Sequence, residues 1–330
     1  MGKPWSIGVI GPGLIWHATH KKVLQGMPER ARVAAFAARR PETRAKAAAD
    51  APEAAVYEDY RELLRSSDVD AVAVLTPIPL NAPVTIEALE AGKHVLVEKP
   101  MGTSLAEAAA IREAERKSGR VVCVLEQVRY AEGLIQARRL IEEGRIGRVV
   151  SYDRVAHFRF EPDSPGGFGG TDWRIDPSYP LGTLFDGGIH DMSELSYLFG
   201  PAAEVYARGT KLRETYGEYD HVLLTLTHES GVVGSYGHSG AMPPDRNYFY
   251  IRGTKGILRY TRSSIEIEGD EPASIPVAAA NANARMWEHA LDALEGRPSA
   301  MFYGAEAAER DVAALEAAAA SLRTGKAVRL

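Results

Sequence analysis

The chain has 330 residues, of which 45% are hydrophobic and 25% are charged, and its formal net charge is −5. These values are ordinary for a globular protein of one or two domains. No run of Lys and Arg interleaves with aromatic residues, and no apolar run approaches the length of a membrane span, so we expect neither a nucleic-acid nor a membrane partner. The single cysteine, Cys123, excludes a disulfide within the chain and is expected to be a small core residue. The first residues leave no room for a signal peptide, and we expect a cytoplasmic protein.

A short apolar strand is predicted at 6–10, and the turn Gly11-Pro12-Gly13-Leu14-Ile15-Trp16 follows it. A glycine turn between a strand and a helix lets backbone amides and the helix N-terminus face a pyrophosphate. Gly11, Gly13, Leu14 and Ile15 are therefore candidates for cofactor binding. Trp16 stands where the third glycine of the dinucleotide fingerprint is usual, so the motif is partial, and an ordinary strand–helix turn is the alternative.

A second strand is predicted at 32–37 and an alanine-rich helix at 41–49, with Arg39 and Arg40 between them. An NAD enzyme usually carries an acid at the end of this strand for the ribose 2′-hydroxyl, whereas this chain has Ala38 there. A small residue followed by arginines suits a 2′-phosphate, because guanidinium groups match phosphate geometry. The pattern favours NADP over NAD as the cofactor, with a pair of solvated loop arginines as the alternative.

A buried strand at 70–75 ends in Thr76-Pro77, and a helix is predicted at 84–91. The next strand, His94-Val95-Leu96-Val97-Glu98-Lys99-Pro100, ends abruptly, because proline lacks a backbone donor and biases the residue before it towards extended geometry. Ligands of open parallel sheets bind just beyond the carboxyl ends of the strands. Lys99, preceded by Glu98 that could orient it, is therefore placed to act on a bound substrate. A Glu–Lys pair on a solvated turn is the alternative.

Ser104 and Glu107 form a capping box that opens a helix running to about residue 117, and residues 121–125 are taken as the sixth strand. Six strands that alternate with helices predict a doubly wound parallel sheet. We assign residues 1–124 to this dinucleotide-binding domain and residues 125–330 to a second domain.

The pattern changes in the second domain. A helix is predicted at 131–143 and a long strand at 148–158, and shorter strands are predicted at 204–209, 221–227, 232–238, 248–252, 256–260 and 264–268. This spacing predicts an open, predominantly antiparallel sheet, and the closing helices near 283–294 and 306–322 predict an α+β domain with helices on one face. Apolar positions remain on the other face, so we expect a homodimer or homotetramer.

A second group of catalytic candidates lies in a predicted helix over 181–199. Asp186 and His190 are four residues apart, so on a helix they share a face, and a carboxylate beside an imidazole orients it. The pair fits a general base, whereas a buried histidine satisfied by an aspartate is the alternative. Gly187 and Gly188 lower helix propensity, and close approach of a cofactor or substrate would explain them.

Taken together, these stretches resemble the Gfo/Idh/MocA family, which includes glucose–fructose oxidoreductase and inositol dehydrogenase. The resemblance rests on the glycine turn followed by His20, the Thr76-Pro77 strand end, the block from Ala91 to Pro100, the turn at 144–147, Asp186 with His190, and the final Thr324-Gly325-Lys326-Ala327-Val328. It implies an α/β fold with an N-terminal Rossmann domain followed by the domain with the open sheet. It also implies that His190 takes the hydroxyl proton as hydride leaves for nicotinamide C4, that Lys99 hydrogen-bonds the reacting oxygen and that Asp186 steadies the site.

Two further sets complete the candidate site. The cofactor set adds Thr76, Pro77, Asn81, Glu98, Lys99 and Gln127, and the substrate set comprises Lys99, Arg129, Trp173, Arg174, Tyr179, Asp186 and His190. Aromatic and guanidinium groups suit a polyol, although Trp173 could instead anchor its loop, and Tyr236 and His238 are expected to pack on the sheet. Metal ligands are not expected. Departures from the family pattern are Trp16, Asn81, Gln127 and Ser193, the last with Asp191 nearby.

The predicted function is that of an NADP- or NAD-dependent oxidoreductase. It would transfer hydride between nicotinamide C4 and a hydroxyl or carbonyl carbon of a sugar, inositol or related polyol. An NAD-dependent glycosidase acting by transient oxidation and a non-catalytic, ligand-sensing regulator are the alternatives. The prediction requires that Lys99 and His190 act on one alcohol and that Trp16 leaves the cofactor groove open.

Overall fold

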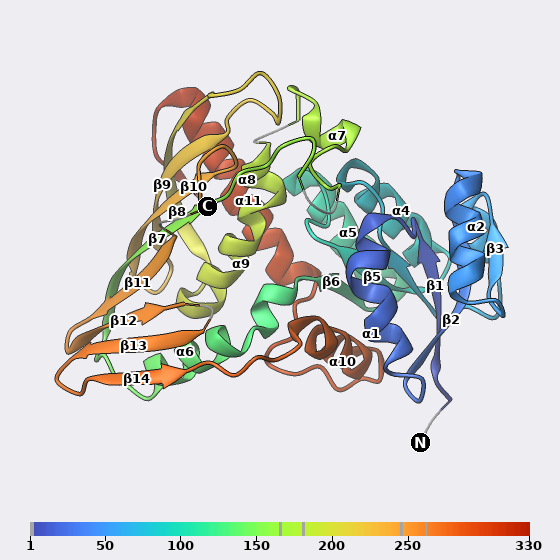
Figure 1. The fold of residues 1–330 in the computed structure, drawn as a ribbon, viewed down its shortest axis with the longest axis horizontal. Coiled ribbons are helices and arrows are strands. Elements are labelled where there is room, and N and C mark those ends of the chain that lie inside the picture. Colours follow the sequence, from blue (N-terminus) through green and yellow to red (C-terminus); the bar gives the residue numbers. More distant parts are fainter. Residues whose placement is uncertain (1–2, 165–166, 180–181, 245–246, 262) are drawn as a thin grey trace. The chain divides into compact units, whose positions relative to one another are not determined.

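The computed structural model describes residues 3–164, 167–179, 182–244, 247–261 and 263–330. The chain divides into two compact units, of which the first comprises Met1–Gln127 with Asn283–Glu309 and the second comprises Val128–Ala282 with Arg310–Leu330. Each unit is built around one β-sheet, which is drawn in blue to cyan in the first unit and mainly in green to orange in the second (Figure 1).

The first unit contains a six-stranded parallel sheet with the strand order β3-β2-β1-β4-β5-β6. Its strands are β1 Trp5–Ile10, β2 Ala31–Ala37, β3 Ala55–Tyr57, β4 Ala71–Val74, β5 His94–Glu98 and β6 Val122–Leu125. This is the strand order of a Rossmann sheet, so the predicted fold of this half is confirmed. The predicted ranges miss only β3, because this three-residue edge strand lacks the apolar run that marks a buried strand.

The helices of this part are η1 Trp16–His20, α1 Lys21–Gln25, α2 Pro41–Asp50, α3 Tyr60–Arg65, α4 Ile78–Glu90 and α5 Leu105–Ser118. The start of α5 is the predicted one, since Ser104 Oγ accepts a hydrogen bond from Glu107 N at 3.2 Å. The start of α4 lies earlier than the predicted residue 84. Pro79 falls in its first turn, where a helix needs no backbone N–H, so this proline does not delay the helix.

The strands β4 and β6 are buried along their whole length, and Cys123 on β6 is fully buried. Burial raises the pKa of the Cys123 thiol to about 12. The expectation that this cysteine is a small core residue is therefore confirmed.

The helix α10 Ala282–Leu294 and the residues up to Glu309 pack with the first unit. This differs from the predicted boundary, which assigns everything after residue 124 to the second domain. An isolated antiparallel bridge joins Gly304 to Cys123, and Trp287 on α10 is fully buried. The amphipathic α10 thus packs within the unit of the parallel sheet, although it follows the antiparallel sheet in the sequence.

The second unit contains a nine-stranded sheet with the order β14-β13-β12-β11-β7-β10-β9-β8-β15. Its strands are β7 Val149–His157, β8 Ala202–Thr210, β9 His221–His228, β10 Val233–Ser239, β11 Tyr248–Gly253, β12 Gly256–Tyr260, β13 Ser264–Gly269, β14 Ala273–Pro276 and β15 Val328–Arg329. Every neighbouring pair is antiparallel except β7 with β10. The predicted open, predominantly antiparallel sheet is confirmed.

Helices cover one face of this sheet. They include α6 Glu132–Glu142, α9 Gly188–Phe199 and α11 Ala305–Thr324, which lie on the same side of the strands (Figure 1). The short helices η2 Gln127–Tyr130, α7 Asp172–Ile175 and α8 Thr183–Asp186 lie in the connections. On the covered face the side chains of β9 alternate into the core, as a half-buried antiparallel strand requires.

The predicted helix over 181–199 is wrong in that it is two helices, α8 and α9, separated at Gly187; residue 181 itself lies outside the described residues. One of the two glycines has a reason within the protein. A Cβ on Gly188 would lie 2.7 Å from Leu184 Cδ1 and 3.2 Å from Tyr236 Oη, so Gly188 admits protein side chains. Packing of the helix on the sheet accounts for the glycine at this position, and close approach of a cofactor or substrate stays a prediction.

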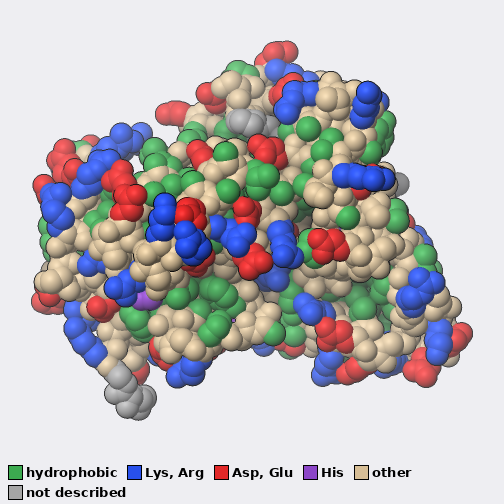
Figure 2. All heavy atoms as spheres, turned by 180° about the vertical axis from the view of Figure 1, so that it is seen from behind, with side chains coloured by type: hydrophobic (Ala, Val, Ile, Leu, Met, Phe, Trp, Pro, Cys, Tyr) green, Lys and Arg blue, Asp and Glu red, His purple; other side chains and the backbone are tan. Residues whose placement is uncertain are grey.

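The other face of the nine-stranded sheet carries apolar side chains that are each at least 36% exposed: Tyr206, Leu223, Val233 and Tyr248. Acidic and basic side chains are interspersed over the molecular face seen in Figure 2. Within the described residues, none of the helices is both long and apolar enough to cross a membrane.

Candidate active site

The glycine turn lies at the carboxyl end of β1. Gly11 has a φ of +78°, and a Cβ there would lie 2.9 Å from Leu75 O, so both conformation and space require glycine. Gly13 N donates to Gly11 O at 2.7 Å, which closes the turn. Leu14 is exposed and Ile15 is half-buried, so the turn presents its backbone beside accessible side chains. This geometry suits the approach of a pyrophosphate.

Trp16 is directed into the first core. Its indole is fully buried and contacts Phe36 edge-on at 5.5 Å, and its Nε1 donates to Asp50 Oδ2 at 2.9 Å. Burial alone would raise the pKa of Asp50, but hydrogen bonds from Lys21 and Trp16 lower it below its usual range. The large side chain is accommodated by the π-helical stretch η1, whose first residue is Trp16. The indole therefore fills space between β2 and α2.

The turn between β2 and α2 carries the two predicted phosphate-binding arginines. Arg39 and Arg40 are exposed, and their side chains have no hydrogen-bond or ion-pair partner among the described residues. Arg44 fixes the backbone beneath them, because its Nη1 donates to Ala38 O at 2.8 Å and to Arg39 O at 2.7 Å. Arg40 is also the N-cap residue of α2, where the helix dipole favours an anion.

Lys99 follows the last residue of β5, at the same edge of the sheet as the glycine turn. The Glu98 carboxylate accepts from His20 Nε2 at 2.8 Å, and among the described residues this is its only side-chain partner. The expectation that Glu98 orients Lys99 through a direct contact is therefore corrected. Any effect of Glu98 on the lysine passes through the backbone.

Asn81 braces the strand end. Its Nδ2 donates to Glu98 O at 3.0 Å and to Pro100 O at 2.9 Å, and its Oδ1 accepts from Thr76 Oγ1 at 2.8 Å. The amide is fully buried, and both of its N–H groups are used within the protein. Pro77 is the N-cap residue of the same helix, α4. The cofactor contacts predicted for Thr76, Pro77 and Asn81 stay predictions.

Gln127 and Arg129 lie on η2, directly after β6. Gln127 is half-buried, and its cofactor contact stays a prediction. Arg129 is buried, and its Nη1 donates to Ser193 O at 3.2 Å while its guanidinium lies 4.9 Å from the centre of the Tyr197 ring. Arg129 therefore braces α9, and its contact with substrate remains a prediction.

Asp186 and His190 lie on either side of the break between α8 and α9. His190 N donates to Gly187 O at 3.2 Å, a short-range bond that restarts the helix after the break. The Asp186 carboxylate accepts from Arg174 Nε at 2.6 Å. The sequence pattern did not indicate this guanidinium, which comes from the short helix α7, and the predicted pairing of Asp186 with the His190 imidazole stays a prediction.

The loop before α8 gathers the predicted substrate residues. The Arg174 guanidinium lies 3.9 Å from the centre of the Trp173 ring, and Tyr179 contacts Trp173 edge-on at 5.6 Å. The Tyr179 hydroxyl is buried and has no hydrogen-bond partner among the described residues. Burial, and then the nearby Asp186 charge, raise the pKa of Tyr179 well above its usual value. A buried phenol with no protein partner is a candidate donor to a ligand hydroxyl.

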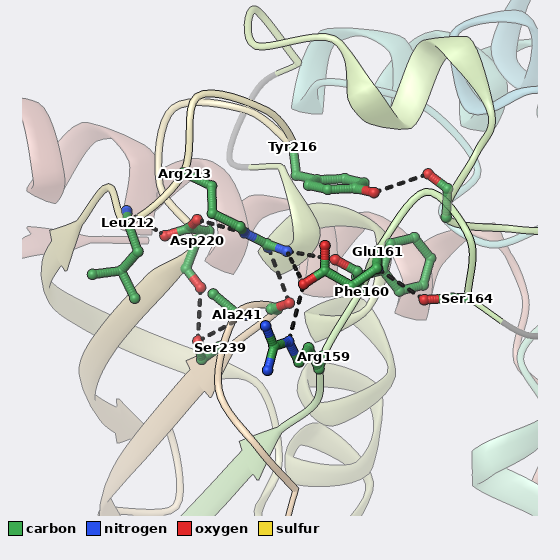
Figure 3. Close-up of polar contacts among 12 residues, drawn as sticks. Arg159, Phe160, Glu161, Ser164, Leu212, Arg213, Tyr216, Asp220, Ser239 and Ala241 are labelled. Carbon is green, nitrogen blue, oxygen red and sulfur yellow. Dashed lines mark hydrogen bonds and ion pairs between the residues drawn. The ribbon is translucent and has the colours of Figure 1, made fainter.

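Arg213 ties this loop to the sheet (Figure 3). Its Nε donates to Asp220 Oδ2 at 3.0 Å, its Nη2 donates to Gly240 O at 3.0 Å, and its Nη1 donates to Phe160 O. The guanidinium also lies 4.7 Å from the centre of the Tyr216 ring. Figure 3 shows that the cluster joins the segment after β7 to the segment between β8 and β9.

A buried polar chain lies beneath α9. Tyr236 Oη donates to Asp191 Oδ2 at 2.7 Å, so it accepts from His238 Nδ1 at 2.9 Å, and the neutral ring leaves Nε2 to accept from Thr183 Oγ1 at 3.3 Å. Arg154 Nε donates to Asp191 Oδ1 at 2.8 Å. Tyr236 and His238 are fully buried, which agrees with their predicted packing role. Arg154 and Thr183 were not predicted as members of this chain of hydrogen bonds, because their partners Asp191 and His238 are distant in the sequence.

The class of protein follows from the first unit. A doubly wound sheet with a glycine turn after β1 and the strand order β3-β2-β1-β4-β5-β6 defines a dinucleotide-binding Rossmann domain. Residues 5–126 match the oxidoreductase family with an NAD-binding Rossmann fold, and residues 134–259 match the GFO/IDH/MocA C-terminal domain. The chain belongs to the GFO/IDH/MocA family of oxidoreductases.

Three similar proteins illustrate the range of this family. The dTDP-3,4-didehydro-2,6-dideoxy-alpha-D-glucose 3-reductase of Streptomyces violaceoruber is 35% identical over 257 residues, which are 72% of this chain and 71% of that protein. The NADP(+) scyllo-inositol 2-dehydrogenase IolW of Bacillus subtilis is 27% identical over 268 residues, which are 81% of this chain and 70% of that protein. The crystal structure of an oxidoreductase from Thermotoga maritima superposes with a TM-score of 0.91 at 27% identity and covers 99% of this chain and 98% of that one.

Proposed function

We propose that this oxidoreductase interconverts a hydroxyl and a carbonyl group on a sugar, an inositol or a related polyol, with NADP as the favoured cofactor. One observation carries the proposal: Lys99 follows a strand end that is fixed by Asn81 and lies at the same sheet edge as the glycine turn. A cation at that edge can serve an oxygen that gains negative charge. The names of the inositol dehydrogenase and sugar nucleotide reductase relatives support the substrate class.

The roles proposed for the chain's own residues follow from their chemistry. When bound, the nicotinamide ring takes or supplies the hydride. In the oxidation direction His190 accepts the proton of the substrate hydroxyl, and Lys99 donates a hydrogen bond to the same oxygen. We propose that Asp186, whose carboxylate accepts from Arg174 Nε, contributes a fixed negative charge to the same reaction. In the reverse direction the same groups return the proton to the carbonyl oxygen.

We propose that the Tyr179 hydroxyl and the Trp173 ring bind the polyol. The phenol is a buried donor without a partner among the described residues, and an aromatic face suits the C–H surface of a sugar. Arg174 holds Asp186 rather than presenting an open cation, so a neutral polyol fits this loop better than an acidic one. Arg129 would contribute from η2.

A panel of sugars, inositols and their keto derivatives, screened for absorbance change at the nicotinamide band, tests the proposal. Substrate-dependent reduction of NADP or oxidation of NADPH is the expected result. Release of a sugar from a glycoside without net nicotinamide reduction would replace it with the glycosidase alternative. Tight ligand binding that survives in Lys99→Ala, with no turnover on any member of the panel, would replace it with the ligand-sensing alternative.

The preference for NADP gives a specific prediction. Replacing Arg39 by alanine removes an exposed cation next to the N-terminus of α2, and we expect the Kd for NADP to rise about tenfold while the Kd for NAD changes little. Titration of each cofactor against the enzyme measures both constants. Arg32→Ala, an exposed arginine near the opposite end of β2, is the matched control. Equal losses for NADP and NAD in Arg39→Ala would remove the argument for a 2′-phosphate.

We also propose that the exposed face of the nine-stranded sheet joins two copies of the chain as a homodimer or part of a homotetramer. Leu223 and Tyr248 face outward there, and a cross-strand row through Gly237 and Val155 links their positions. A charge in this row would have to be desolvated on association, so Leu223→Glu is expected to shift the chain towards monomer. Light scattering after size exclusion measures the mass. Leu212→Glu, an exposed leucine outside the sheet, is the control, and an unchanged mass in Leu223→Glu would contradict the proposal.

A further inference from the structure

A buried histidine in the first unit connects the strand end that precedes Lys99 to a tryptophan from the far end of the sequence. His20 is 1% exposed, and its Nε2 lies 2.8 Å from Glu98 Oε1. On its other side, Trp287 Nε1 donates to His20 Nδ1 at 3.0 Å, and the two rings meet edge-on at 5.7 Å. The proposed reaction uses neither ring.

These contacts fix the tautomer of His20. An indole N–H can only donate, so the Nδ1 atom that receives it carries no hydrogen. The neutral ring therefore carries its hydrogen on Nε2, which is the nitrogen that faces the Glu98 carboxylate. The other neutral tautomer would set two donors against each other at Trp287 and two acceptors against each other at Glu98. Trp287 thus selects the only neutral form of His20 that can hold Glu98.

Holding Glu98 restrains the backbone on one side of Lys99. The His20 bond fixes the carboxylate, and the Asn81 amide binds the carbonyls of Glu98 and Pro100, the two neighbours of the lysine. The lysine backbone is consequently held on both sides. Removing the His20 bond would free one of these restraints.

Trp287 is itself firmly placed. It lies on the buried face of α10, and the turn after α10 is tied to the sheet because Val124 N donates to Tyr303 O at 2.9 Å. Near the C-terminal end of α10, Arg30 Nη2 donates to Asp292 Oδ1 at 2.9 Å. A segment that follows the antiparallel sheet in sequence therefore contributes a rigid donor to the edge that precedes Lys99.

We propose that Trp287 and His20 are positioning residues for Lys99, in which the indole sets the histidine tautomer, the histidine holds Glu98, and Glu98 fixes the backbone of the lysine. This inference rests on the proposed role of Lys99 as the group that binds the reacting oxygen. By this inference a residue of α10 affects the position of Lys99, whereas the sequence pattern predicts only an amphipathic helix of the second domain.

The test is Trp287→Phe in the full-length chain, which keeps an aromatic ring and removes the donor. We expect kcat to fall about tenfold or more, because small displacements of a reacting group are costly, while the Kd for NADP and the KM for the polyol stay near their wild-type values. The ¹⁵N signals of His20, assigned by their absence in His20→Gln, are expected to move away from those of the pure Nε2–H tautomer, because in this variant only Glu98 still disfavours the other form. A purely structural role for Trp287 would alter stability without this change.

Trp5→Phe is the matched control. Trp5 also meets a histidine edge-on, His94 at 5.5 Å, but both residues lie at the amino ends of β1 and β5, away from Lys99. This variant is expected to keep the wild-type kcat and the wild-type His20 signals. A folded Trp287→Phe enzyme whose kcat matches that of Trp5→Phe would overturn the proposal.

Two further measurements distinguish a failure of this proposal from a failure of the proposed function and from a failure of the variant to fold. The first needs no substrate: the rate at which an N-hydroxysuccinimide ester acetylates Lys99 is divided by its rate at Lys93, measured in the same digest. We expect this ratio of rates to rise in Trp287→Phe. An unchanged ratio would contradict the proposal. Should Trp287→Phe fail to fold, His20→Gln, which retains an N–H donor for Glu98, is expected to keep more of the wild-type kcat than His20→Leu. Equal kcat values in these two variants would likewise contradict it.

Discussion

Replacing Lys99 by methionine is expected to lower kcat by about 10³-fold while the Kd for NADP stays within about threefold of the wild-type value. Methionine keeps the length of the side chain and removes the amine that we propose to bind the reacting oxygen. The backbone should stay in place, because Asn81 binds the carbonyls of Glu98 and Pro100 and makes no use of the lysine amine. The loss should therefore fall on the chemical step.

His190→Ala is the companion variant, and we expect a loss of about 10²- to 10⁴-fold in kcat, the usual contribution of a general base. Turnover at saturating substrate and cofactor binding by NADPH fluorescence are measured separately for both variants. Lys117→Met, on the exposed face of α5, is the control for the loss of one lysine. Rates close to wild type in Lys99→Met or His190→Ala would overturn the proposed roles.

The second large effect expected is a loss of stability in mild acid. His238 is fully buried, and burial lowers its pKa from 6.5 to about 4. The unfolded chain takes up a proton as the pH falls below 6.5, whereas the folded ring stays neutral until about pH 4. The stability conferred by the neutral ring is therefore complete above pH 6.5 and declines as the pH falls towards 4. At pH 4 the free energy of unfolding is lower by about 3 kcal/mol because of this histidine.

His228 adds to the same trend. Burial lowers its pKa, although hydrogen bonding to the Gly200 carbonyl opposes the shift. Its Nδ1 donates to Gly200 O at 2.7 Å, so its Nε2 accepts from Tyr152 Oη at 3.0 Å, and protonation of Nε2 would break the second bond. His94 behaves similarly, since its Nδ1 accepts from Val121 N at 3.1 Å and burial lowers its pKa.

The measurement is the urea midpoint between pH 7.5 and 4.5, followed by near-ultraviolet circular dichroism. In wild type the midpoint should fall steadily below pH 6.5. His238→Asn keeps a donor for Tyr236 and cannot titrate, so its midpoint should start lower at pH 7.5 and depend less on pH. His17→Asn, at an exposed position, should keep the wild-type dependence. A His238→Asn protein with the wild-type dependence would show that this histidine is not the source of the acid sensitivity.

Local patterns in the sequence predict most of the fold. Buried parallel strands are short apolar runs bounded by turn residues, and β1, β2, β4, β5 and β6 could all be located in this way. The alternating strands from β7 to β13 were located for the same reason, because one face of that sheet is buried and the other is not. The missed strands are the short edge strands β3, β14 and β15, which have too few residues to show a period.

Features that depend on distant contacts could not be predicted. The amphipathic face of α10 indicates burial, but nothing local says that the partner is the parallel sheet. Similarly, the spacing of Asp186 and His190 suggests one helix, whereas packing of Gly188 against Tyr236 accompanies a break between them. The Arg174 partner of Asp186 lies on the short helix α7, whose position relative to α8 cannot be derived from sequence spacing.

The candidate site likewise contains residues that local sequence predicts and residues that only distant contacts place. The glycine turn, the arginine pair and the lysine after β5 follow from local rules, because each lies at the carboxyl end of a predicted strand. Their supporting residues do not, since Asn81, His20 and Trp287 reach the same strand end from separate parts of the chain. Local sequence thus predicts candidate groups for the chemistry, and the packed structure reveals what holds the strand end that precedes Lys99.

Transfer of deuterium is the measurement that tests the central claim most directly. The enzyme is incubated with NADPH carrying deuterium at nicotinamide C4, together with keto derivatives of sugars and inositols, and the products are examined by mass spectrometry. We predict that one deuterium appears on the carbinol carbon of a polyol product, and that this label is lost in both Lys99→Met and His190→Ala. Products without label, or labelled products formed equally well by the two variants, would contradict the account.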